Sequence, residues 1–158
     1  MPIFMTLYFL NFLNFFSKIS ILRIVIFCVI LNLAVTWLFF FILFPDTQGF
    51  KFSSISEELF SVLIISPVIE TYFIQHLTIT LLRKYVKNDL INLIVSAILF
   101  ALIHNYSVGY MIKGFIAGLI YATEYLIIEK KNKHPIYWVI ATHALFNLIA
   151  SGLDFFLS

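Results

Sequence analysis

The sequence contains very little charge. Only 11% of its 158 residues are Asp, Glu, Lys or Arg, whereas 62% are hydrophobic and the mean hydropathy is +1.03. Soluble domains carry roughly 25% charged residues, and a water-soluble fold of this composition would expose apolar patches that soluble monomers avoid. The scarcity of charge therefore excludes an ordinary soluble domain and indicates a membrane protein.

Other absences narrow the class further. Cys28 is the single cysteine, so the chain cannot form an internal disulfide, and we expect this thiol to pack against lipid or protein. A formal net charge of +2 gives no reason to expect nucleic-acid binding. The alternation of apolar and polar residues that marks membrane β-barrels is missing. Because backbone polar groups must be satisfied internally in lipid, the long apolar runs predict helices.

Five apolar runs are candidates to cross the hydrocarbon core, which takes about 20 residues. They cover residues 21–44, 59–82, 90–104, 110–128 and 135–157, and the third is short. Residues 1–20 are apolar and aromatic but are interrupted by polar residues, which is typical of an interfacial helix; a short extra span is the alternative. We therefore predict an all-α polytopic membrane bundle of about five transmembrane helices plus an N-terminal interfacial helix, as a single domain over residues 1–158.

Basic residues are distributed unevenly over the connections. Eight of the ten are Lys18, Arg23, Arg83, Lys84, Lys87, Lys130, Lys131 and Lys133. With five spans, all eight fall on the same side of the membrane. The other side carries Asp46, Lys51, Glu57, Glu58 and Asp154. The positive-inside rule then predicts an integral protein of the cell membrane with its N-terminus in the cytoplasm and its C-terminus outside.

Glu70 is the most unusual residue of the predicted spans. It lies near the middle of the second run, too deep for its short side chain to reach the interface. Such a residue must be neutral, paired or facing a wet cavity, and it marks a candidate functional site. Pro67 lies just upstream, where its ring frees backbone carbonyls and bends the helix.

Two histidines and an amide accompany this carboxylate. His104 ends the third run, with Phe100 one turn before it on the same face, where the ring could wall the imidazole. His143 and Asn147 lie four residues apart in the fifth run, so one helix face presents both. Such a pair could bind a developing oxyanion. Hydrogen bonding between helices is the simpler interpretation of the same pair.

The remaining polar and small residues of the spans have simpler interpretations. Gly114, Gly118 and Ala122 form a stripe that favours close helix packing. Glu124 is interpreted as lining the mouth of a cavity or reaching the interface rather than as catalytic. His76 falls on a different helix face from Glu70, so we leave it out of the predicted site.

The residue inventory restricts the chemistry. The HExxH pair of zinc proteases, the GxSxG elbow of serine hydrolases and a glycine-rich phosphate loop are all missing. A carboxylate with a histidine can deprotonate a water, and a histidine with an asparagine can stabilise charge on a carbonyl oxygen. The set Glu70, His104, His143 and Asn147 therefore suits peptide hydrolysis in a cavity enclosed by the membrane.

The order and spacing of these residues resemble the CPBP intramembrane proteases, also called the CAAX protease and bacteriocin-processing or Abi family. The resemblance covers roughly Ser66 to Asn147, with a protease-like core at about 58–157. The matching positions are Pro67 and Glu70 in the first motif, Phe100 and His104 in the second, Phe115, Gly118 and Ala122 in the third, and His143 and Asn147 in the fourth.

The resemblance implies specific roles. Glu70 and His104 would activate a water, and His143 with Asn147 would stabilise the oxyanion. Glu70, His104 and His143 could also hold a divalent metal such as zinc. The chain departs from the first motif, because its second glutamate is Thr71, its arginine is Gln75 and its following glycine is His76. The two missing charges are expected to pair with each other in the family, and such a pair is best lost together.

Three functions stay open at this point. The first is an intramembrane endopeptidase that acts on a small peptide or membrane-protein substrate, possible contexts being bacteriocin processing and self-immunity. The second is a non-catalytic immunity or binding protein on the same scaffold, for which Glu70→Gln should keep function. The third is a proton-coupled transporter component, which should show pH-dependent flux and no cleavage product.

Overall fold

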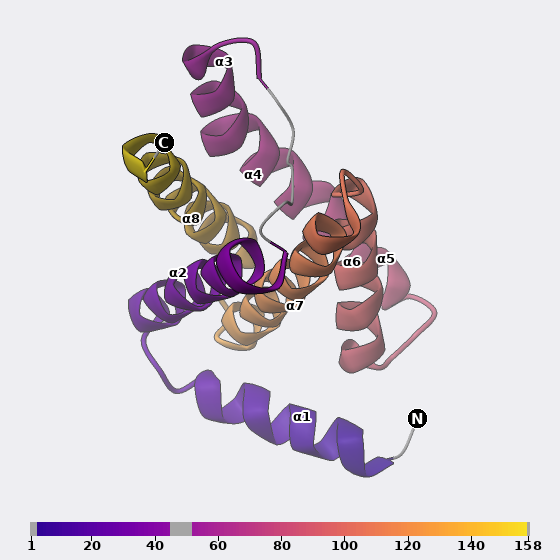
Figure 1. The fold of residues 1–158 in the computed structure, drawn as a ribbon. Helices are drawn as coiled ribbons and strands as arrows, with labels where there is room; N and C mark the ends of the chain where they lie inside the picture. Colours follow the sequence, from indigo (N-terminus) through magenta and orange to yellow (C-terminus); the bar gives the residue numbers. More distant parts are fainter. Residues whose placement is uncertain (1–2, 45–51, 158) are drawn as a thin grey trace.

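The computed structural model describes residues 3–44 and 52–157, and in these residues the chain forms six helices and no strand (Figure 1). They are α1 (Ile3–Phe16), α2 (Ile21–Trp37) with the π-helix η1 (Leu38–Leu43), a long helix over Ile55–Leu82, α6 (Asp89–Ile103), α7 (Val108–Lys130) and α8 (Pro135–Leu157). The predicted all-α class is confirmed. Asp46 and Lys51, assigned above to the outer connection, lie outside the described residues.

Each predicted span has a helix at its place, but the helices differ in length. Ile55–Leu82, Val108–Lys130 and Pro135–Leu153 are long and apolar enough to cross a membrane. α1 and α2 meet the same criteria only together, and a bend of 119° separates them, so counting this pair as one broken span brings the number to four. α6 is apolar but has 15 residues. The steep turn after α1 agrees with an N-terminal helix that lies apart from the first span.

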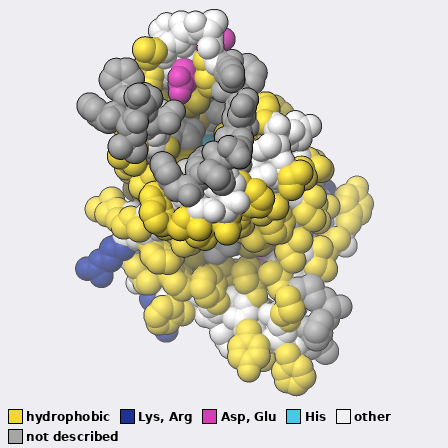
Figure 2. All heavy atoms as spheres, in the orientation of Figure 1, with side chains coloured by type: hydrophobic (Ala, Val, Ile, Leu, Met, Phe, Trp, Pro, Cys, Tyr) yellow, Lys and Arg dark blue, Asp and Glu magenta, His cyan; other side chains and the backbone are white. Residues whose placement is uncertain are grey.

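α7 occupies the centre of the bundle, with α2, α6 and α8 around it (Figure 1). In its most apolar stretch 61% of the residues are buried, compared with 22% in each of the other two long spans. Figure 2 shows the outside of the bundle, where hydrophobic side chains cover most of the described face. A membrane environment accounts for both observations, because lipid can solvate the outward-facing apolar side chains.

The helix over Ile55–Leu82 alternates between α and π geometry. Its segments are α3 (Ile55–Phe60), η2 (Ser61–Ile65), α4 (Ser66–Ile69), η3 (Glu70–Leu77) and α5 (Thr78–Leu82). In η2 the N–H of Ser66 donates to the carbonyl of Ser61, five residues earlier. The next donor in this register would belong to Pro67, which has no N–H. The carbonyl of Val62 is therefore left for a partner from elsewhere.

The basic connections lie at one end of the bundle. The Arg83 guanidinium after α5 is 2.7 Å from the Glu129 carboxylate near the end of α7. Lys131 Nζ donates to the carbonyl of Ser17 at 2.5 Å, which brings the turn between α1 and α2 to the same end. These contacts agree with the topology used to assign the charge asymmetry. The assignment of this end to the cytoplasm stays a prediction.

Candidate active site

A polar pocket of about 100 Å³ lies between the long Ile55–Leu82 helix, α6, α7 and α8. Its lining residues are Val62, Ser66, Phe100, His104, Tyr110, Lys113, Gly114, Ala117, Tyr121, His143, Phe146 and Asn147. Three of the four predicted site residues are in this lining, and the fourth, Glu70, contacts two of them. Residues from three different spans therefore converge as the sequence predicts.

The two carboxylate oxygens of Glu70 have different surroundings. The hydroxyl of Ser66, one turn earlier, donates to Oε1. Oε2 is buried, has no hydrogen-bond partner among the described residues, and lies 3.9 Å from Nε2 of both His104 and His143. Two imidazole nitrogens thus face the same carboxylate oxygen. At this separation a water that hydrogen-bonds both Oε2 and an imidazole is one way to satisfy these groups.

The His104 ring is fixed in orientation by its helix. Its Nδ1 lies 2.7 Å from the carbonyl of Phe100, and because a carbonyl can only accept, Nδ1 carries the proton in this contact. In the neutral imidazole, Nε2 then keeps its lone pair toward Glu70. The ring stacks on Phe100 with centroids 4.6 Å apart, so Phe100 forms the wall that the sequence predicts.

The His143 ring is enclosed on its other side by Tyr121. The two rings are stacked with centroids 4.6 Å apart, and His143 is only 5% exposed. Gly114 and Gly118 of α7 let His104 and Phe100 approach closely. A Cβ on Gly114 would stand 3.1 Å from the Cβ of His104, and one on Gly118 would stand 2.8 Å from the Cβ of Phe100. The predicted packing role of the stripe is confirmed for these two glycines.

Asn147 has a partner that sequence reasoning missed. Its Nδ2 donates to the carbonyl of Val62 at 2.6 Å. This is the carbonyl that Pro67 leaves without a backbone donor, so the amide compensates for the proline one helix away. The hydroxyl of Ser96 likewise donates to a carbonyl of the π-helix η3, that of Ile74, at 2.8 Å. At least one of the two N–H groups of Asn147 is therefore committed to the scaffold.

Lys113 is a pocket residue that the sequence analysis did not select. It is 9% exposed, its Nζ lies 4.7 Å from the ring centroid of Tyr110 and 5.8 Å from that of Phe146, and Glu70 is within electrostatic reach. A lysine near the start of a span is ordinarily interpreted as one that reaches the interface. The helix face on which Lys113 lies could have identified it, because Ala117 and Tyr121 follow at four-residue intervals and line the same pocket.

The resemblance implies a zinc site formed by Glu70, His104 and His143. Among the described residues, no group of three or more His, Cys, Asp or Glu side chains is arranged to hold a metal ion. Tetrahedral zinc ligands about 2.1 Å from the ion stand roughly 3.4 Å apart, whereas both Glu70–histidine pairs are separated by 3.9 Å. Lys113 also places a like charge in this pocket. The residues as arranged do not fit zinc, whose binding stays a prediction.

The two departures from the first motif lie next to the site. Thr71 and Gln75 are both 0% exposed. Thr71 Oγ1 and both polar atoms of the Gln75 side chain have no hydrogen-bond partner among the described residues. Neutral side chains therefore occupy the buried positions where the resemblance predicts a glutamate and an arginine, which avoids an unpaired buried charge.

Two other polar residues lie outside the pocket. The interpretation of Glu124 as a mouth-lining or interfacial residue is wrong, because its side chain is 0% exposed and its Oε1 accepts a 2.6 Å hydrogen bond from Thr142 of α8. The sequence pattern of α7 gave no sign that α8 buries the Glu124 side chain. His76 is not in the pocket lining, and its Nδ1 lies 2.7 Å from the Tyr125 hydroxyl, which agrees with leaving it out of the predicted site.

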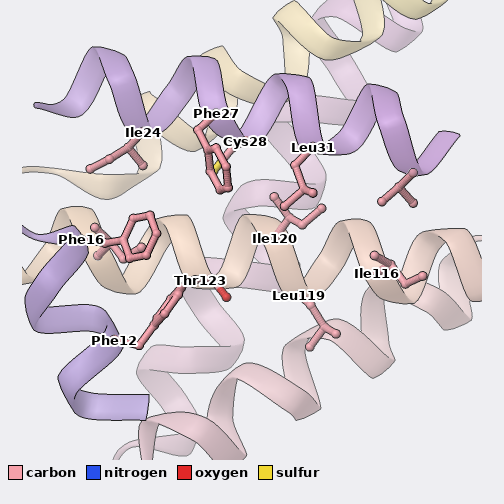
Figure 3. A pocket seen from close by; sticks show the side chains of 12 residues that line it. Phe12, Phe16, Ile24, Phe27, Cys28, Leu31, Ile116, Leu119, Ile120 and Thr123 are labelled. Atoms are coloured by element: carbon pink, nitrogen blue, oxygen red, sulfur yellow. The ribbon is translucent and has the colours of Figure 1, made fainter. Parts of the chain in front are cut away.

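A larger cavity of about 300 Å³ lies elsewhere, between α1, α2 and α7 (Figure 3). Phe12, Phe16, Ile24 and Phe27 are among the aromatic and aliphatic side chains that surround it, and Cys28 points into the same space. Cys28 is buried here, as expected of a packing residue. Size does not identify the site, because the described residues of this wall include no carboxylate, histidine or lysine that could act as a general acid or base.

Comparison with known proteins gives a match to a family model. A family model described as type II CAAX prenyl endopeptidase Rce1-like matches residues 52–149, a range that includes Glu70, His104, His143 and Asn147. No curated protein and no solved structure matches the chain. The matched range covers more than half of the sequence and coincides with the helices that build the polar pocket. On this match, the chain belongs to the Rce1-like family of type II CAAX prenyl endopeptidases.

Proposed function

We propose that the protein is an intramembrane endopeptidase that hydrolyses a peptide bond in a small peptide or a membrane protein. The observation that carries the proposal is the convergence of Glu70 Oε2 with Nε2 of His104 and His143 at 3.9 Å, in a pocket enclosed by apolar helices. A water held by Glu70 Oε2 can also reach both imidazoles. The carboxylate then accepts the proton as the water oxygen attacks the carbonyl carbon.

The two imidazoles have separate tasks in this scheme. His104 is oriented by the Phe100 carbonyl, so its Nε2 can accept a hydrogen bond from the water and direct it. His143 lies on α8 across the pocket. It can stabilise the oxyanion if its Nε2 carries a proton. Glu70 holds the water proton and returns it to the leaving amine. The reaction consumes one water and yields a carboxyl group and an amine.

The substrate class follows from the location of the pocket. A peptide bond can reach Glu70 only as part of a chain that enters the bundle from the membrane or its interface. Processing of a bacteriocin-like peptide, or self-immunity against one, is the context that we propose. Gene neighbourhood is an inexpensive check, because a bacteriocin cluster beside the gene supports this context and its absence from related loci opposes it.

A non-catalytic binding or immunity protein is the second candidate. The observation in its favour is the burial of Thr71 and Gln75 without hydrogen-bond partners among the described residues. If the missing charge pair orients substrate in the family, this chain could bind a peptide without cutting it. The two candidates differ in whether Glu70 is needed as a base.

The deciding experiment compares peptide termini in membrane fractions from cells that produce wild type or Glu70→Gln. This substitution keeps the shape of the side chain and removes the base. Glu58→Gln, at the start of the same helix, is the matched control. Termini that appear with wild type and Glu58→Gln but not with Glu70→Gln support the protease and identify its substrate. Matching profiles in all three, with a protective phenotype retained, would support the binding protein.

A further inference from the structure

Lys113 is a buried cation beside the reacting groups. Among the described residues that line the polar pocket, it is the only lysine or arginine. Its side chain comes from α7, whereas Glu70, His104 and His143 come from the other three helices around the pocket. The faces of Tyr110 and Phe146 lie 4.7 Å and 5.8 Å from its Nζ, so aromatic rings take over part of the solvation that water would provide.

A protease pocket of this kind needs positive charge at one defined moment. When water adds to a peptide carbonyl, the π electrons move onto the carbonyl oxygen and leave a full negative charge there. In a site that excludes water, a donor already aimed at that oxygen stabilises it more than bulk solvent would. The question is which group of this chain supplies the donor.

The pair assigned by resemblance is only partly available. Asn147 donates through Nδ2 to the Val62 carbonyl at 2.6 Å, a bond that replaces the one Pro67 cannot make. His143 directs Nε2 toward the Glu70 carboxylate at 3.9 Å. Lys113 has three N–H donors and a formal charge on a flexible stem, and its side chain lines the same pocket as both residues.

We propose that the Lys113 ammonium is the principal electrophile that stabilises the oxyanion on the scissile carbonyl, an inference that rests on the proposed endopeptidase function. As the water oxygen bonds to the carbonyl carbon, its proton passes to Glu70 and the carbonyl electron pair moves onto oxygen. Lys113 donates a hydrogen bond to that oxygen without giving up its proton. When the C–N bond breaks, the carbonyl re-forms and the nitrogen takes the proton from Glu70.

This role accounts for the presence of a buried lysine in the pocket. An ammonium in a membrane bundle is costly unless it is compensated, and here Glu70 provides an opposite charge within reach. It also assigns Asn147 a scaffold role, in which the amide holds α8 against the π-helix η2 and so places His143. The electrostatic work then belongs to α7, the most buried helix of the bundle.

The test begins with the Glu70-dependent termini defined above. A synthetic peptide that spans the identified cut is incubated with purified protein in detergent, and kcat and KM are measured separately. The variants are Lys113→Met, which removes the charge at similar length, and Lys113→Arg, which keeps it. Lys133→Met is the matched control, because Lys133 is exposed in the connection between α7 and α8.

Loss of a single oxyanion donor lowers kcat by about 100-fold to 1000-fold. We expect Lys113→Met to show such a loss with little change in KM, Lys113→Arg to recover part of it, and Lys133→Met to match wild type. Lys113→Gln replaces Lys113→Met if the latter does not melt cooperatively. Wild-type kcat in the charge-removing variant, or a change in KM alone, would overturn the proposal. If wild type produces no Glu70-dependent termini, the endopeptidase function itself fails, and this proposal fails with it.

Discussion

Glu70 and Glu124 are two buried carboxylates of one membrane bundle with opposite surroundings. Glu70 gives one oxygen to Ser66 and turns the other toward two imidazoles at the edge of a polar pocket. Glu124 accepts a hydrogen bond from Thr142 and is absent from the lining of both cavities described above. Neither side chain is exposed to solvent to any large extent, so burial alone does not separate a base from a structural group. What separates the two residues is access to a pocket and the presence of proton acceptors.

The difference also reflects the backbone on which each residue lies. Glu70 begins the π-helix η3, next to a proline that leaves a carbonyl for Asn147 to satisfy. Glu124 lies within the regular α-helix α7. π-segments are frequent at functional sites because they redirect side chains and carbonyls. In this chain the irregular helix carries the candidate base Glu70, whereas Glu124 packs within a regular helix.

The largest expected effect separates the two carboxylates directly. General acid–base groups contribute about 100-fold to 10,000-fold to rate, so we expect Glu70→Gln to lose cleavage of the identified peptide by such a factor. Glu124→Gln should cleave close to the wild-type rate, because the amide can still accept from Thr142. The measurement is the initial cleavage rate of purified variants. Equal losses in both would break the comparison and make Glu124 part of the chemistry.

A pair of histidines provides the next test. His104→Gln should lower kcat by about 100-fold or more, since the neutral Nε2 acceptor facing Glu70 is lost. His76→Gln is the matched control, because His76 contacts the Tyr125 hydroxyl rather than the pocket. It should keep the cleavage rate and lose about 1 kcal/mol of stability with that hydrogen bond. Rates measured beside thermal melting in detergent distinguish the two effects, and a slow His76→Gln enzyme would argue against the boundaries of the site.

Two glycine substitutions test the packing of α6 against α7. A Cβ at position 118 would stand 2.8 Å from the Cβ of Phe100 and 2.9 Å from the Cα of Ala97, so α6 must move away from α7. We expect Gly118→Ala to cost about 1–3 kcal/mol of stability and to slow cleavage by shifting His104. Gly152→Ala meets nothing within 4 Å and should melt at or above the wild-type temperature. Identical melting curves for the two variants would contradict the close approach of α6 and α7.

The smallest expected effect is that of metal removal. Because Glu70, His104 and His143 do not form a ready zinc site and Lys113 lines the same pocket, we expect the cleavage rate to be unchanged by 1,10-phenanthroline. The control is a zinc protease assayed in the same detergent. Inhibition that added zinc reverses would establish the metal predicted from the family resemblance and would require the pocket to contract around it.

Much of the site could be predicted because its signals are local. Glu70, His104 and His143 stand out in apolar runs, and the spacing of His143 and Asn147 places both on one helix face. Asn147 was harder to assign, since its partner is a carbonyl exposed by a proline 80 residues earlier, and only the folded chain brings the two together. Lys113 and Glu124 could not be assigned from their own helix at all. Both lie on α7, and what encloses each of them comes from other helices.

The sequence by itself determined the membrane class, the positions of the helices and which carboxylate and imidazoles are the candidates for the site. These properties follow from hydropathy, helix period and the cost of polar groups in lipid, all of which act along one segment. Tertiary structure alone decided that Lys113 enters the pocket, that Asn147 is tied to Val62 and that Glu124 is enclosed by Thr142. The physical reason is rotation about each helix axis. One residue of register turns a side chain by about 100°, and packing between helices sets that register.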